Sequence, residues 1–253
     1  IHRIGGADYV FGLMPDKNII KIDTSGPKPR LSPVGEVPIG HDSMVVDDEL
    51  MTGKTLLYAS NGGAGFDIWD VSNPAPQKVG AWNIPDRPKD KYYIHTGAIA
   101  FLEGRRIAVV TTEDWEDYPS VAYVLDATKL DGIELLSSWS APGDHAADGL
   151  RYSMHNPRFM GGALLLAYYH GGVWALDLAT QAAREHPAVI GQYMPNVSNG
   201  WTPTNPATSA YADKQCGEFH LTDAPEVFDV EPGDGVVYVA DLTTGLYTLK
   251  PTW

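Results

Sequence analysis

Five residues that could carry chemistry stand at corresponding places along the chain. Each lies at or just before the start of the first strand expected in a repeated segment: His2, His41, His95, His155 and Glu226. Imidazoles and carboxylates are side chains that bind first-row transition metals in proteins. The spacing therefore predicts a metal site for Zn, Cu, Mn or Fe, formed by His41, His95, His155 and Glu226.

The neighbours of these histidines suggest how the site would be supported. Asp42, Asn156 and Arg158 closely follow histidines and would orient them through hydrogen bonds. With His2, which stands near the end of the sequence, they form the predicted binding set. The alternative is structural: each histidine caps a strand start and bonds to the neighbouring segment.

Two further stretches carry polar and aromatic side chains. The run from Glu113 to Asp117 is acidic and is followed by Tyr118. It could bind Ca²⁺, but it lacks the DxDxDG spacing and is better read as a solvated loop. Tyr169 and His170 follow a second strand. We expect them at the opposite end of their segment from His155, with Tyr169 packing and His170 in a turn.

Several familiar catalytic signatures are missing from the sequence. It contains no P-loop, no GxGxxG after a strand, no GxSxG elbow and no HExxH. The single cysteine, Cys216, has no evident histidine partner, which argues against a nucleophilic role, and one cysteine forms no internal disulfide.

The elements that position these residues follow one repeated order. The clearest copy is Phe66–Trp82, FDIWDVSNPAPQKVGAW, whose pattern predicts a strand, a tight polar turn and a second strand. In each segment a first strand leads to a very apolar second strand, a Gly-containing turn and a third strand. Four third strands close in aspartate, about 50 residues apart: Asp23, Asp70, Asp126 and Asp177.

This repeat predicts an all-β fold. A period of about 40–50 residues with three or four strands is typical of a β-propeller blade, whereas a β-sandwich does not need the same order five times. We predict a single β-propeller domain, 1–253, of about five visible blades with three to four antiparallel strands each. The blades are roughly 1–39, 40–90, 91–142, 143–222 and 223–253, and the domain could be part of a longer native chain.

Two details depart from the repeat. The best helix candidate, Leu178–Glu185, is short and interrupts the strands, and the fifth segment has only three obvious strands. Ile1–Ile4 could complete the fifth. In a propeller all innermost strands run the same way around one axis, so the predicted ligands would meet at one mouth of the central channel.

The repeat resembles a known family. The run FDIWDVSNPAPQKVG is similar to the LVIVD repeat, and Ala122–Asp126 and Val173–Leu178 are similar but lack its Ser-x-Pro tail. The run Asp241–Tyr247 resembles the closing repeat of such proteins. The resemblance implies a propeller that is secreted, periplasmic or on the cell surface, and it supplies no catalytic set.

Composition narrows the partners. The 253 residues carry a formal net charge of −14, which argues against nucleic acid or an anionic membrane, and no stretch is apolar enough for a membrane helix. Three functions remain open: an extracytoplasmic binding or scaffold protein for a protein or small molecule, a metal-dependent lyase or oxidase, and a subunit of a larger surface assembly, including a homo-oligomer.

Overall fold

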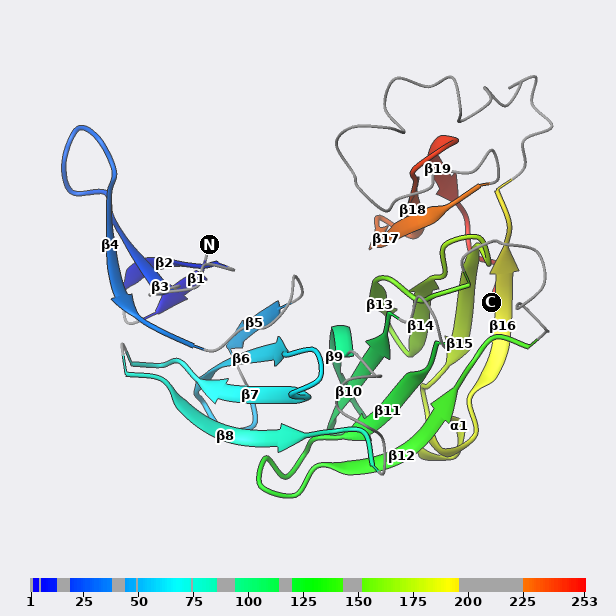
Figure 1. The fold of residues 1–253 in the computed structure, drawn as a ribbon, viewed down its shortest axis with the longest axis horizontal. Coiled ribbons are helices and arrows are strands. Elements are labelled where there is room, and N and C mark those ends of the chain that lie inside the picture. Colours follow the sequence, from blue (N-terminus) through cyan, green and yellow to red (C-terminus); the bar gives the residue numbers. More distant parts are fainter. Residues whose placement is uncertain are drawn as a thin grey trace. The chain divides into compact units, whose positions relative to one another are not determined.

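The protein is all-β, with five small antiparallel sheets that follow one another along the chain (Figure 1). The structure is a computed structural model that describes residues 2–4, 6–12, 19–37, 44–48, 50–73, 75–85, 94–113, 120–142, 152–195 and 225–253. Its contacts divide the chain into two units, Ile1–Gly97 with Asp126–Glu134, and Ala98–Leu125 with Leu135–Trp253. Each unit is described by itself.

The first unit contains two four-stranded sheets in simple sequential order. The first sheet consists of β1 (His2–Ile4), β2 (Ala7–Phe11), β3 (Ile19–Asp23) and β4 (Arg30–Gly35). The second consists of β5 (Met44–Asp48), β6 (Thr55–Ser60), β7 (Phe66–Asp70) and β8 (Gln77–Trp82). The expectation that Ile1–Ile4 completes the fifth segment is wrong, because β1 pairs with β2, His2 opposite Tyr9.

The third sheet leads into the second unit. It consists of β9 (Ile94–Leu102), β10 (Arg105–Thr112), β11 (Ala122–Asp126) and β12 (Glu134–Trp139). The division between the units falls within β9, so this strand begins in the first unit and continues in the second. His95 is the second residue of that strand.

The second unit also contains the fourth and fifth sheets. The fourth consists of β13 (Pro157–Met160), β14 (Ala163–Ala167), β15 (Val173–Asp177) and β16 (Ala188–Tyr193). The fifth has three described strands, β17 (Val227–Gly233), β18 (Val236–Asp241) and β19 (Gly245–Leu249).

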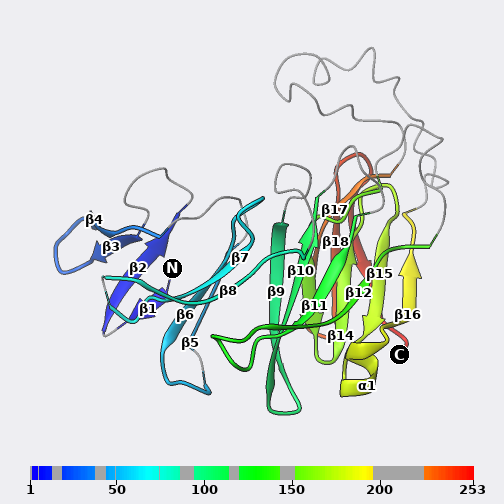
Figure 2. The ribbon, with the colours of Figure 1, turned by 60° about the horizontal axis from the view of Figure 1, so that its bottom comes forward.

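A short helix, α1 (Gln181–Glu185), connects β15 to β16 and lies at the end of the fourth sheet where β15 ends (Figure 2). The Thr180 side chain caps it by accepting from Ala183 N. This confirms the expected helix in Leu178–Glu185. No helix in the described ranges is long and apolar enough to span a membrane.

The recurring aspartates have one structural role. Each ends a third strand, and its side chain accepts a hydrogen bond of 2.9–3.0 Å from the backbone N–H two residues later. The donors are Ser25, Ser72, Thr128 and Ala179. This Asx turn stops the strand and reverses the chain toward the fourth strand. Because the aspartate side chain itself forms the turn, the residue type recurs in four sheets.

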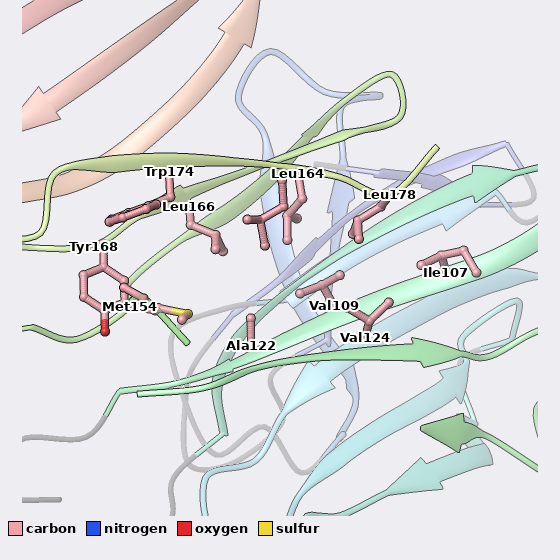
Figure 3. Close-up of a cluster of buried hydrophobic side chains, with 12 residues drawn as sticks. Ile107, Val109, Ala122, Val124, Met154, Leu164, Leu166, Tyr168, Trp174 and Leu178 are labelled. Atoms are coloured by element: carbon pink, nitrogen blue, oxygen red, sulfur yellow. The ribbon is translucent and has the colours of Figure 1, made fainter. Parts of the chain in front are cut away.

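The most apolar strands are the most buried. Every residue of β6 and β14, and all of β10 except its first, is buried. In the second unit, Figure 3 shows the side chains of β10 and β11 facing those of β14 and β15 in one cluster. Burying a leucine such as Leu164 or Leu166 completely contributes about 1.5–3 kcal/mol. In the second, third and fourth sheets the buried second strand therefore anchors the sheet and holds the polar residues just beyond its end.

Candidate functional site

His155 lies two residues ahead of β13 and is buried, with 4% of its surface exposed. Its backbone N–H donates to Ala167 O (2.9 Å), and its ring Nδ1 lies 2.8 Å from Phe228 O. A carbonyl oxygen only accepts, so Nδ1 carries the proton of this hydrogen bond. In the neutral ring Nε2 then keeps its lone pair, and it is the nitrogen that can bind a metal.

Glu113 directly follows β10 and is also buried, at 7% exposure. The Tyr169 hydroxyl donates to its Oε1 over 2.5 Å. The expectation of a solvated acidic loop is therefore wrong for Glu113; residues 114–119 lie outside the described ranges. A carboxylate withdrawn from water needs charge-assisted hydrogen bonds or a cation to offset its desolvation.

Two predicted ligands and one unpredicted ligand come together. His95, Glu113 and His155 each offer one ligand atom, and these atoms all lie within 4.8 Å of one another. All three residues are buried. Ligand atoms bound tetrahedrally to one zinc ion at about 2.1 Å are roughly 3.4 Å apart. Small side-chain movements would therefore bring the group to metal-binding distances.

Tyr169 lies beside this group, which corrects the expectation that it packs at the opposite end of its segment from His155. Its ring centroid is 5.5 Å from that of His155, and both rings contact Phe228. The physical reason is antiparallel pairing: β13 begins where β14 ends, with Pro157 opposite Leu166. The turn position of His170 is confirmed.

The remaining predicted ligands are placed differently. Glu226 directly precedes β17 and is fully buried, and its backbone carbonyl accepts from Leu242 N (2.9 Å). It does not belong to the close group of His95, Glu113 and His155. His41 and Asp42 lie outside the described residues. His2 begins β1 in the first unit and is partly buried.

The two predicted supporting residues of the fourth sheet have other partners. Asn156 takes part through its backbone carbonyl, which accepts from Ala167 N (3.1 Å). Arg158 donates through Nε to Glu231 Oε2 (3.0 Å) and through Nη1 to Pro157 O (2.9 Å), and its Nη2 lies 3.7 Å from Asp229 Oδ1. The guanidinium is thus engaged by an acidic pair on β17, and the role of Arg158 in orienting a histidine stays a prediction.

A simple rule would have found Glu113 and Tyr169 in the sequence. In an antiparallel pair, the residues after the second strand lie beside those before the first strand. Glu113 follows the apolar strand that comes after His95, and Tyr169 follows the one that comes after His155. Reading each histidine together with the end of the next strand therefore predicts the acidic and phenolic neighbours.

Comparisons with known proteins identify the fold class. No family model and no curated protein matches the chain. The chain is similar to the solved β-propeller domain of Cps50 (Swd1) from Myceliophteria thermophila, at 12% identity and a TM-score of 0.51, covering 92% of this chain and 64% of that one. It is likewise similar to the Nup133 β-propeller domain from Vanderwaltozyma polyspora, at 10% identity and a TM-score of 0.51, covering 92% and 65%.

The protein is therefore a β-propeller, as its repeat predicts, and its five sheets correspond to five blades. It spans less than two thirds of the length of each of those two chains. At such low identity the likeness concerns the fold alone, a fold that hosts many unrelated functions. The more specific resemblance to LVIVD repeats stays a prediction.

Proposed function

We propose that this β-propeller binds a divalent transition-metal ion through His95, Glu113 and His155. The observation that carries the proposal is the close approach of three buried ligand atoms, within 4.8 Å of one another. Nitrogen and carboxylate oxygen ligands suit Zn, Cu, Mn and Fe. The sequence predicts the same four metals for a set of His41, His95, His155 and Glu226, of which His95 and His155 belong to this group.

The surroundings of His155 and Glu113 support this proposal. The hydrogen bond from Nδ1 of His155 to Phe228 O sets the tautomer that metal-binding histidines use. The hydrogen bond from Tyr169 to Glu113 is of the kind that orients ligating carboxylates. A cation between the two side chains would also offset the cost of burying the Glu113 charge.

The number of ligands favours a metal site with an open coordination position. Structural zinc sites are usually closed by four protein ligands, whereas catalytic sites have three and keep a position for water or substrate. With three protein ligands among the described residues, the bound ion would have that open position. Acting there as a Lewis acid or redox centre, it would serve the enzyme alternative, a lyase or an oxidase.

Elemental analysis tests the proposal. We expect the wild-type protein, purified without chelator and exposed to ZnSO₄, to retain about one metal ion per chain after desalting, because three ligands bind it together. His155→Ala and Glu113→Gln should each lose it. His186→Ala is the matched control, since His186 is an exposed histidine that caps the C-terminus of α1. Wild-type protein without metal would reject the proposal.

A second candidate, a protein-binding scaffold, is favoured by the edge of the fifth sheet. This sheet has three described strands where each of the other four has four, and Leu246 on β19 is 73% exposed. Among the described strands none pairs with the outer edge of β19. Such an edge can accept an added strand, and we propose a second copy of this chain as its source. Light scattering should give a dimer for the wild type and a monomer for Leu246→Lys. A monomeric wild type would reject the proposed dimer.

We also propose an extracytoplasmic location, which the resemblance to LVIVD repeats implies. Fractionation of cells that express the full-length native chain would test it. Protein found only in the cytoplasmic fraction would reject it.

A further inference from the structure

We propose that Tyr169 is the positioning residue of this metal site and sets the orientation of both Glu113 and His155. This inference rests on the proposed function, because it concerns the same ion. Tyr169 contacts two of the three proposed ligands: its hydroxyl bonds to Glu113 and its ring packs against His155. It is fully buried, so water does not compete for these contacts.

The hydrogen bond to Glu113 is short. Its 2.5 Å length lies at the short end of the range for a hydroxyl that donates to a charged carboxylate. A donor on Oε1 fixes the rotation of the carboxyl group about its last bond. With Oε1 engaged by the hydroxyl, Oε2 would be the oxygen that binds the metal, and the carboxylate would bind through a defined atom instead of rotating freely.

The ring contacts act on the imidazole. The rings of His155 and Tyr169 are tilted by 58°, and the His155 ring lies 3.9 Å from that of Phe228, tilted by 32°. Tyr169 and Phe228 also contact each other, 6.3 Å apart and edge to face. Packing by these two rings, together with the hydrogen bond to Phe228 O, restricts rotation of the His155 ring about its χ2 torsion.

The backbone of Tyr169 shows that this placement is imposed by its surroundings. Its φ of 34° is in the left-handed region, which a bulky non-glycine residue rarely adopts. The Tyr169 carbonyl accepts from Gly172 N (3.1 Å) and Val227 N (2.9 Å), which hold the conformation. Strained residues of this kind persist where the fold determines them and often cluster at functional sites.

The experiment is a Co²⁺ titration of chelator-treated protein, followed by visible absorption. Tyr169→Phe keeps the ring and removes only the hydroxyl. Loss of a partner that orients a ligand weakens metal affinity about 10–100-fold. We expect Tyr169→Phe to bind Co²⁺ that much more weakly and with a changed d–d spectrum, which a purely structural role would leave alone. Tyr193→Phe is the control, because Tyr193 is a partly buried tyrosine that contacts Tyr247. Removing its hydroxyl should change neither the Co²⁺ affinity nor the d–d spectrum.

The outcomes separate the two proposals. If the wild type does not bind Co²⁺, the metal-binding function fails and the role of Tyr169 fails with it. If the wild type binds Co²⁺ and Tyr169→Phe binds it with the same affinity and spectrum, only the role of Tyr169 is overturned. Weaker binding with a changed spectrum in Tyr169→Phe alone supports both.

Discussion

The two ends of the fourth sheet use their polar side chains in different ways. At one end β15 stops at Asp177, whose carboxylate accepts from Ala179 N and turns the chain. At the other end His155 and Tyr169 face each other beyond the ends of β13 and β14. We call these the aspartate end and the histidine end.

The aspartate turn is repeated, whereas at the histidine end the position of the histidine recurs but the residue after the second strand varies. The same aspartate turn closes the third strand in four of the five sheets. The residue at or just after the end of the second strand, in contrast, differs among four sheets: Asn61, Glu113, Tyr168 and Asp241. The repeated aspartate makes one local hydrogen bond and has the same structural role in each blade. The side chains after the second strands differ between blades, and this variation allows some of them to form a functional site.

The largest expected difference between the two ends concerns two glycines of the fourth sheet. Gly172 at the histidine end has φ +78°, and an added Cβ would lie 2.3 Å from Tyr193 O; Gly161 at the other end has φ +60° with nothing within 4 Å. Gly172→Ala should cost about 3 kcal/mol or more from strain and overpacking, and Gly161→Ala about 1–2 kcal/mol. Urea unfolding measures both, and equal losses would contradict the placement of the turn.

Within the fourth sheet, metal-linked stability should depend on the histidine end and not on the aspartate end. Zn²⁺ at a hundred times its dissociation constant should raise the free energy of unfolding by about 2.7 kcal/mol. Asp177→Ala should keep this increase while lowering the metal-free stability, and His155→Ala should lose it. Thermal unfolding with and without ZnSO₄ measures both effects. An increase that survives in His155→Ala would place the ion elsewhere.

The aspartate turns should contribute to stability in a pH-dependent way, as Asp70 at the end of β7 in the second sheet illustrates. Burial favours a higher pKa for its carboxyl, but hydrogen bonds from Lys54 and Ser72 and the Lys54 charge outweigh it and lower the pKa. A lowered folded-state pKa gives stability that is present above the unfolded value of about 3.9 and is lost as pH falls through the folded value. Asp70→Ala should cost about 1–2 kcal/mol at pH 7.

Urea unfolding at several pH values checks this prediction. The difference between wild type and Asp70→Ala should shrink as the pH falls below about 4, where the carboxyl becomes protonated in the unfolded state, and be lost below the lowered folded-state pKa. Metal binding should not change. A difference that is constant between pH 7 and pH 3 would show that the charge of Asp70 does not contribute.

The smallest effect is expected for Arg158. It pairs with Glu231 and Asp229, and all three side chains are a third or more exposed. Such pairs contribute about 0.2–1 kcal/mol, so Arg158→Ala should lower the stability by that amount and leave the metal affinity unchanged. A tenfold loss of Zn²⁺ affinity in a titration would instead assign Arg158 to the site.

The fold could be predicted because the same local interactions recur in successive blades. The aspartate turns and the apolar second strands depend on short-range hydrogen bonds and on burial, and both leave a periodic trace in the sequence. The partner of the first strand leaves no such trace: β1 pairs with the adjacent β2, whereas the sequence also allows Ile1–Ile4 to complete the fifth segment. No residue type in Ile1–Ile4 distinguishes those two partners.

The site could be predicted only in part. His95 and His155 stand out by register, but Glu113 was assigned to a solvated loop from its acidic neighbours. Its burial depends on Tyr169, which is 56 residues away in the chain and bonds to it across two sheets. No residue near Glu113 in the sequence indicates this contact, but the antiparallel pairing that places Glu113 and Tyr169 each beside a histidine can be anticipated.

The metal position itself is the most direct test of the central claim. Crystals soaked in ZnSO₄ and measured at the zinc absorption edge would locate the ion by anomalous scattering. We predict one strong peak per chain, about 2.0–2.2 Å from a nitrogen of His95, the Nε2 of His155 and an oxygen of Glu113. A map without a peak there, or with its only peak at another place, would contradict the account.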